Sequence, residues 1–190
     1  MPTRTWQSPE ASVSKADHDS SFTQYAESAL PRLRPIAYLL CRDWHRADDL
    51  VQTSAVKLYV HWDRALHIGN LDGYLRTILV NTYIEEQRST WWKRITVHHD
   101  RAPDPAAPEQ DLAGSLDLRK ALAAIPARQR ATLVLRFYCE LSVEETAQTL
   151  GCSTGTVKSQ TSRGLANLRR AMSGRAEEQA DSVLPYPFAA

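Results

Sequence analysis

The segment from Leu141 to Met172 restricts the fold of this 190-residue chain more than any other part of it. Ser142 stands three residues before Glu145, which is the spacing of a capping box at a helix N-terminus. Gly151 suits the left-handed residue that ends a helix, and Ser153 can cap a second helix. The segment therefore predicts two short helices joined by a tight turn, a helix-turn-helix.

The second of these helices has one apolar and one polar face. Its inner positions are Val157, Thr161, Gly164, Leu165 and Leu168. Its outward positions carry hydroxyl, amide and cationic groups, namely Thr154, Thr156, Lys158, Ser159, Gln160, Ser162 and Arg163. Such groups suit base edges and phosphates in a major groove. A solvated helix with its charges outside is the alternative, but the capping box and the turn spacing favour DNA binding.

The rest of the chain shows helical periodicity and no alternating strand pattern. Apolar residues recur at three- and four-residue steps from Phe22 to Leu40, where Pro31 or Pro35 predicts a break or kink. A second helix is expected from about Ala47, and a third from about Asp72 to Arg94. The predicted fold class is all-α, with two small helical domains joined by a flexible linker.

Composition divides the chain into five parts. The start is polar and predicts disorder, a proline-rich stretch predicts an extended linker, and the end is acidic. The parts are a disordered tail over 1–18, a first domain over 19–95, the linker over 96–113, a second domain over 114–173 and an acidic tail over 174–190.

The helix that precedes the helix-turn-helix is expected to open at Pro126. Proline is favoured at the first helical position, because no helical partner exists there for an N–H. We expect this helix to carry Leu133, Val134 and Phe137 among its apolar side chains.

Charge, hydropathy and cysteine content exclude several classes of protein. The net charge is +1, so an argument for nucleic-acid binding rests on the four cations, with no acid, between Thr154 and Met172. No apolar run of about 18 residues could span a membrane and no signal peptide is recognisable, so we expect a cytoplasmic protein without membrane insertion. Cys41, Cys139 and Cys152 are scattered, and we expect buried or half-buried thiols without a metal site or cofactor.

Three motifs, in this order, resemble the extracytoplasmic-function sigma factors, the smallest members of the primary sigma family. The first is DDLVQ (48–52) and the second is GYLRTILVN (73–81). The third combines LSVEETA (141–147) with GTVKS (155–159). The resemblance implies a factor that directs RNA polymerase core to promoters and assists promoter melting, with no catalytic residues.

The resemblance assigns the first motif to the polymerase. Asp48, Asp49 and Gln52 are then expected to contact the clamp helices of the beta-prime subunit, where the carboxylates can meet arginines of the partner. Two acids near a helix start also suit the helix dipole, which is the alternative reading of the same pair. Thr53 and Ala55 depart from the family pattern, which commonly has an acid and an aromatic residue there. The implied partners are RNA polymerase core, through its beta-prime and beta subunits, promoter DNA, and an anti-sigma factor that clamps both domains.

The resemblance assigns the minus-ten promoter element to the third helix and to the loop over 66–70 before it. Aromatic rings can stack on unpaired bases, and cations can follow phosphates. The expected contacts are Asn70, Asn81, Arg88, Trp91, Trp92, Lys93 and Arg94. Adjacent residues on a helix cannot both face the same way, so at least one tryptophan can instead pack inside the protein.

The helix-turn-helix is expected to read the minus-thirty-five element. Gln160 stands where an arginine is frequent in the family, and glutamine suits adenine better than guanine. An altered base preference is therefore expected, which exchanging Gln160 for arginine in promoter-selection assays would test.

Two other classes of function remain as alternatives. One is a helix-turn-helix repressor or activator, which would need a dimer on half-sites about one helical turn apart. The other is an enzyme, for which His98, His99 and Cys139 are the candidate residues. The two histidines fall in the predicted linker and Cys139 at a helix end, which favours a solvated pair over a catalytic or metal site.

Overall fold

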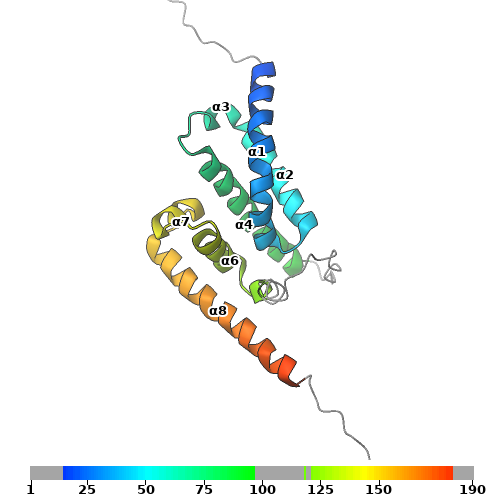
Figure 1. Ribbon diagram of the computed structural model, residues 1–190, viewed down its shortest axis with the longest axis vertical. Coiled ribbons are helices and arrows are strands. Elements are labelled where there is room, and N and C mark those ends of the chain that lie inside the picture. Colours follow the sequence, from blue (N-terminus) through cyan, green and yellow to red (C-terminus); the bar gives the residue numbers. More distant parts are fainter. Residues whose placement is uncertain (1–14, 97–117, 119–120, 182–190) are drawn as a thin grey trace, which may run out of the picture.

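The computed structural model describes residues 15–96, 118 and 121–181, and for 90–96 and 174–181 it describes the backbone alone. All regular structure within these ranges is helical (Figure 1). The all-α prediction is confirmed. The tail over 1–14, the linker residues 97–113 with His98 and His99, and the last residues of the acidic tail lie outside the described residues.

The first half of the described chain (15–96) holds four helices: α1 (Lys15–Cys41), α2 (Trp44–Val60), α3 (Trp62–Ala65) and α4 (Leu71–Thr96). α1 packs against α2 and α4, and α2 packs against α4 (Figure 1). Large side chains that are almost fully buried form the centre of this bundle: Leu40, Leu58, Trp62, Leu79 and Tyr83. Each such burial stabilises the fold by about 1.5–3 kcal/mol before entropy is counted.

The first helix is longer and more regular than its sequence predicts. It begins at Lys15, so residues 15–18 belong to the helix and not to a disordered tail. It also continues through Pro31 and Pro35, so the expected break is absent. A proline inside a helix costs about 3 kcal/mol. Apolar residues of the same stretch, including Leu33 and Ile36, are buried in the bundle and offset that cost.

The second helix begins at Trp44 rather than near Ala47. Its N-cap is Asp43, whose carboxylate accepts a hydrogen bond of 2.8 Å from the backbone N–H of Arg46. Asp48 and Asp49 therefore lie beyond the first turn, where the helix dipole acts on them only weakly.

The second half contains α6 (Ala127–Leu133), a π-helix η1 (Val134–Tyr138), α7 (Val143–Leu150) and α8 (Thr154–Asp181). Pro126 is the N-cap of α6, as its sequence predicts to within one residue. In η1 the N–H of Cys139 donates to the carbonyl of Val134 at 3.0 Å. This wider turn rotates the following side chains away from the α-helical face, and Phe137 is consequently exposed rather than part of the core.

The predicted helix-turn-helix is confirmed in α7, the turn and the start of α8. Ser142 Oγ accepts from the N–H of Glu145 at 3.0 Å, and the carboxylate of Glu145 accepts from the N–H of Ser142 at 2.7 Å. Gly151 ends α7 in the left-handed region, with φ of 58°. Ser153 Oγ then caps α8 by accepting from the N–H of Thr156 at 3.1 Å.

The first turns of α8 pack on α7, and its middle turns pack on α6. Val157 is fully buried, as expected for the inner face. A Cβ atom at Gly164 would lie 3.1 Å from the side chain of Leu133, so glycine allows α6 and α8 to approach closely. α8 continues to Asp181, into the predicted acidic tail.

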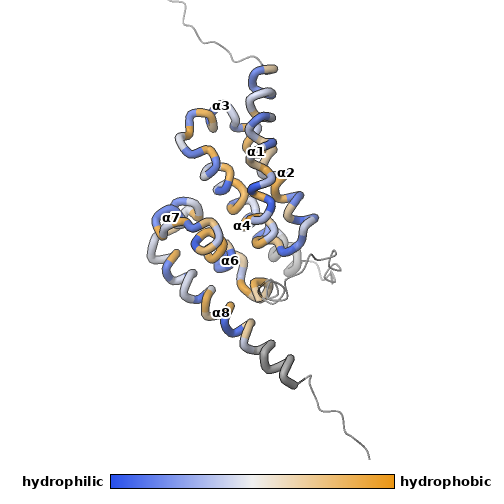
Figure 2. Tube along the Cα trace, viewed as in Figure 1, coloured by the Kyte–Doolittle hydropathy of each residue, from blue (hydrophilic) through white to orange (hydrophobic). Residues whose placement is uncertain are grey.

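The two halves meet in one apolar core. Leu40 and Tyr83 of the first half belong to the same buried cluster as Val134 and Leu135 of the second. α7 also packs against α4, and Figure 2 shows apolar segments on α4 and α6, the helices near the junction. One hydrogen bond crosses this junction from a buried charge: Arg130 Nη1 donates to the carbonyl oxygen of Leu40 at 2.6 Å.

Candidate nucleic-acid interface

The outward face of α8 presents most of its predicted DNA-reading residues to solvent. Thr154, Lys158, Ser162 and Arg163 are exposed, and Thr156, Ser159 and Gln160 are half-buried. Lys158 and Arg163 place two cations on the same helix, five positions apart. This arrangement can contact phosphates on both sides of a groove while hydroxyl groups between them reach base edges.

Two of the predicted readers have local hydrogen bonds of their own. Thr156 Oγ1 lies 2.9 Å from Ser153 Oγ, within the cap of α8. Ser159 Oγ donates to the carbonyl of Thr156 at 2.9 Å. Their hydroxyls therefore support the helix start, and the cationic side chains are the stronger candidates for DNA contact.

Gln160 faces the first half of the protein. Together with Thr156 it lines a small pocket to which α4 contributes Ile84. The other walls of the pocket are Arg128, Thr132, Leu150 and Cys152. In this arrangement the neighbourhood of Gln160 is shared between the two halves, and its side chain is only half exposed to solvent.

The loop over 66–70, between α3 and α4, exposes apolar side chains. Leu66 is 48% exposed and Ile68 is 38% exposed, although both have large aliphatic side chains. Asn70 Oδ1 accepts a hydrogen bond of 2.8 Å from the N–H of Gly73, so Asn70 caps α4. Leu66 and Ile68 were missed by sequence reasoning, because a loop has no periodicity that reveals which side chains are exposed.

α4 brings together only part of its predicted site. Asn81 is half-buried and Arg88 is exposed, seven residues and about two helical turns apart on α4. The backbone of α4 continues through Trp91, Trp92, Lys93 and Arg94. Their side chains lie outside the described residues, so their contacts with the minus-ten element stay a prediction.

The structure separates the three predicted polymerase contacts. Asp48 forms a two-pronged ion pair with Arg34 of α1, at 2.6 Å to Nε and 3.0 Å to Nη2. The guanidinium of Arg34 also lies 4.6 Å from the ring centre of Trp44. Asp49 and Gln52 are exposed on the outer face of α2. Asp48 is thus engaged in holding α2 to α1, whereas Asp49 and Gln52 face solvent.

The same outer face of α2 carries two exposed valines, Val56 at 63% and Val60 at 68%. Val56 lies one turn after Gln52, and Val60 one turn further, so they continue its side of the helix. Sequence reasoning missed them, although they lie on the helix face opposite the buried stripe of α2, where an apolar residue is a recognisable signal. Exposed β-branched residues beside an acid and an amide form a surface suited to docking another protein.

Acid is expected to weaken the Arg34–Asp48 pair. The hydrogen bonds from Arg34 hold the pKa of the Asp48 carboxyl below its ordinary value. The pair therefore stabilises the fold above the unfolded pKa of about 3.9, and this contribution is lost as pH falls through the lowered folded pKa. Because both side chains are about half exposed, solvent screens the pair and keeps this contribution small. Urea unfolding at pH 6 and pH 3 should show a smaller acid-induced loss for Asp48→Asn than for wild type.

Glu27→Gln provides the control for that measurement, because Glu27 is an exposed acid on the same helix α1. It should keep the wild-type acid response. An Asp48→Asn profile that coincides with wild type at both pH values would contradict the role of the pair.

The described residues hold no cluster of His, Cys, Asp and Glu side chains arranged for a metal ion. Cys41 is buried, and Cys139 and Cys152 are half-buried, as predicted. Burial raises the pKa of the Cys41 thiol to about 11. Among the described helices, none is both long and apolar enough to cross a membrane.

Helical packing, the capped helix-turn-helix and the cations on α8 define a helix-turn-helix DNA-binding protein. Residues 25–93 match the family model for Sigma-70 region 2, and residues 115–168 match Sigma-70, region 4. The chain is 36% identical to the RNA polymerase sigma-E factor of Streptomyces avermitilis, over 81% of this chain and 86% of that protein. It is 32% identical to the ECF RNA polymerase sigma factor EcfG of Rhodopseudomonas palustris, over 74% of this chain and 79% of that protein.

A solved structure shows the same fold. It is the co-crystal structure of the sigma factor RpoE with the anti-sigma factor NepR from Bartonella quintana. The TM-score is 0.65 and the identity 29%, covering 81% of this chain and 98% of that one. The chain belongs to the extracytoplasmic-function sigma factors, and it directs RNA polymerase to promoters for transcription initiation.

Proposed function

We propose that the three exposed surfaces described above divide the work of promoter recognition. The outer face of α2, with Asp49, Gln52, Val56 and Val60, docks on RNA polymerase core. The loop over 66–70 and the outer side of α4 bind and hold open the minus-ten element. The outward face of α8 reads the minus-thirty-five element. The observation that carries this division is that each surface is exposed while the residues behind it are buried.

The minus-ten surface combines features that suit unpaired DNA. Leu66 and Ile68 can enter between or against splayed bases, and Arg88 can follow the phosphates. Holding the strands apart in this way uses binding energy and requires no hydrolysis. We accordingly propose that the protein has no catalytic activity of its own and acts inside the cell, where the polymerase is.

We propose that the two DNA-binding surfaces do not serve both promoter elements in the packed arrangement. The elements lie roughly 25 base pairs apart, which is about 85 Å of duplex at 3.4 Å per base pair. The halves meet directly through Leu40, Val134 and Leu135. We therefore propose that they separate on the polymerase, and that an anti-sigma factor, like the one bound to the Bartonella RpoE, holds this chain in the packed state.

Run-off transcription tests the proposed function directly. Purified bacterial core polymerase, this protein and a fragmented genomic library should give discrete start sites that depend on the protein. The upstream sequences of those sites should share two elements. Specific DNA binding by the protein alone, combined with no transcripts, would instead indicate a repressor or activator.

Charge reversal on α2 tests the polymerase surface. Asp49→Arg should weaken binding to core polymerase about tenfold, because a cation then faces the cationic partner surface across the interface. Its stability should stay near wild type, since Asp49 is exposed. Fluorescence anisotropy of the labelled full chain against core polymerase measures the affinity.

Glu27→Arg makes the same reversal on the exposed side of α1 and should leave polymerase affinity within about twofold of wild type. Equal polymerase affinities for the Asp49 and Glu27 variants would contradict the assignment of Asp49 to the docking surface.

A further inference from the structure

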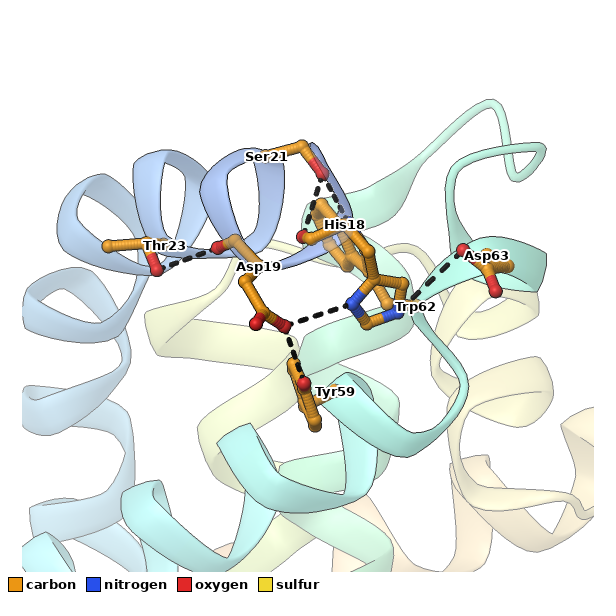
Figure 3. A network of polar contacts seen from close by, with 7 residues as sticks. All are labelled: His18, Asp19, Ser21, Thr23, Tyr59, Trp62 and Asp63. Carbon is orange, nitrogen blue, oxygen red and sulfur yellow. Dashed lines mark hydrogen bonds and ion pairs between the residues drawn. The ribbon is translucent and has the colours of Figure 1, made fainter. Parts of the chain in front are cut away.

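The start of α1 contacts the end of α2 and the short helix α3, which leads into the loop over 66–70 (Figure 3). Tyr59 donates its hydroxyl hydrogen to Asp19 Oδ1 at 2.6 Å. The indole Nε1 of Trp62 donates to Ser21 Oγ at 2.8 Å. His18 lies between two carboxylates, with Nδ1 3.6 Å from Asp19 and Nε2 3.7 Å from Asp63. Three of these contacts join α1 to the N-terminal side of the loop: Asp19 with Tyr59, Ser21 with Trp62, and His18 with Asp63.

Aromatic packing reinforces these polar contacts. The ring of Phe22 meets those of Tyr59 and Trp62 edge to face, at centroid distances of 5.1 Å and 5.3 Å. Trp62 is only 1% exposed, so its N–H needs the hydroxyl of Ser21 as a partner. A buried indole N–H without an acceptor would lose its hydrogen bond to water without replacement, which destabilises the packed state.

The C-terminal side of the loop is tied to the same helix. Tyr25 donates its hydroxyl hydrogen to Asp72 Oδ1 at 2.8 Å. Arg32 lies 3.2 Å from the other carboxylate oxygen of Asp72. Asp72 is the second residue of α4, two positions after Asn70 ends the loop. Both ends of the loop over 66–70 therefore depend on α1.

We propose that His18, Asp19, Ser21, Tyr25 and Arg32 form an α1 brace that positions the loop over 66–70 for binding the minus-ten element. The part of the brace over 18–22 precedes the Sigma-70 region 2 match, which starts at residue 25. The loop presents Leu66 and Ile68, which are only partly covered by the protein, and contacts outside the loop help to hold them in one geometry. Fixing both ends of the loop before DNA arrives removes ordering entropy from the binding step. These are positioning residues, since they act through Tyr59, Trp62 and Asp72.

The test combines Asp19→Ala with Ser21→Ala in the full chain, assembled with core polymerase. Promoter opening, followed by permanganate reactivity of thymines at the minus-ten element, should fall about tenfold, because two hydrogen bonds that hold the N-terminal side of the loop are lost. Affinity for core polymerase should stay within twofold of wild type. The conservative pair Asp19→Asn and Ser21→Thr keeps both acceptor oxygens and should restore opening.

Matched controls lie on the same helix. Thr23 and Ser28 donate their hydroxyls to carbonyls of α1 itself, at 2.8 Å and 2.9 Å. Thr23→Ala with Ser28→Ala removes two hydroxyls from α1 without touching the loop, and should open promoters like wild type. Normal opening by the brace variant would overturn the inference, and so would an equal loss of opening and of polymerase binding, which indicates general destabilisation.

Because this inference rests on the proposed role of the loop, a loop variant is measured in parallel. Leu66→Ser with Ile68→Ser should lose promoter opening while it retains polymerase binding. Normal promoter opening by this loop variant would contradict the minus-ten role of the loop, and with it the brace proposal. Defective opening by the loop variant together with normal opening by the brace variant would contradict the brace proposal alone.

Discussion

Replacing Arg130 with alanine should lower the free energy of unfolding by about 2–5 kcal/mol, a large part of the 5–15 kcal/mol typical of a domain. Arg130 is only 7% exposed. It donates to the carbonyls of Leu40 at 2.6 Å and of Ile125 at 2.9 Å, and to that of Ala123 at 3.3 Å. Alanine would leave these carbonyls without their donor, at about 1–3 kcal/mol for each one that stays buried.

The same substitution should loosen the junction between the halves. Burial lowers the pKa of Arg130, which shows that the charged form loses solvation here. The hydrogen bonds to the carbonyls of Leu40, at the end of α1, and Ile125, just before α6, offset this loss of solvation only while the two halves are in contact. Urea unfolding of the full chain, followed by circular dichroism and tryptophan fluorescence together, should become less cooperative for Arg130→Ala.

Arg128→Ala is the matched control, because Arg128 lies on the same helix α6 and is exposed. Its free energy of unfolding should stay within about 0.5 kcal/mol of wild type. Equal stabilities for the Arg130 and Arg128 variants would show that the buried guanidinium contributes nothing net to the packed state.

Removing both exposed cations of the recognition face, Lys158→Ala with Arg163→Ala, should reduce holoenzyme binding at the minus-thirty-five element roughly 100-fold. Each lost contact at this exposed face is worth about 1.4 kcal/mol, a factor of ten in affinity, so two give roughly 100-fold. The slope of log K against log salt should also fall by about 0.9 for each phosphate contact removed. Electrophoretic mobility shifts at several salt concentrations measure both quantities.

Arg169→Ala with Arg170→Ala makes the same change in net charge further along α8, at two exposed positions. That variant should bind within a few-fold of wild type and keep most of the salt dependence. If the two double variants lose affinity equally, α8 contributes general charge rather than a reading face.

Local patterns in the sequence were sufficient for the helical elements and for the helix-turn-helix. Ser142 and Glu145 are three residues apart, so their mutual capping depends on backbone geometry that the sequence spacing already implies. Gly151 is similar, because the left-handed conformation is a property of one residue. The inward face that includes Val157 follows from the helical period alone.

Sequence spacing did not predict how distant residues would pair. The family resemblance grouped Asp48 with Asp49 and Gln52, and the structure adds that Asp48 pairs with Arg34, fourteen residues earlier on another helix. The resemblance also assigned Asn70 to DNA, and the structure adds that the Asn70 carboxamide caps α4. In both cases a polar side chain found a partner inside the protein, which removes or limits its availability for an external one.

The sequence alone predicted the fold class and the capped helix-turn-helix, because these depend on residues within one or two helical turns of each other. It also predicted the family, because three short motifs occur in the family's order along the chain. The tertiary structure was needed for the shared core of the two halves, for the α1 brace and for Arg130. Arg130 and Leu40 are separated by 90 residues, and Asp19 and Tyr59 by 40. Such contacts arise only when packing brings helices together, and a one-dimensional pattern carries no record of which helix faces meet.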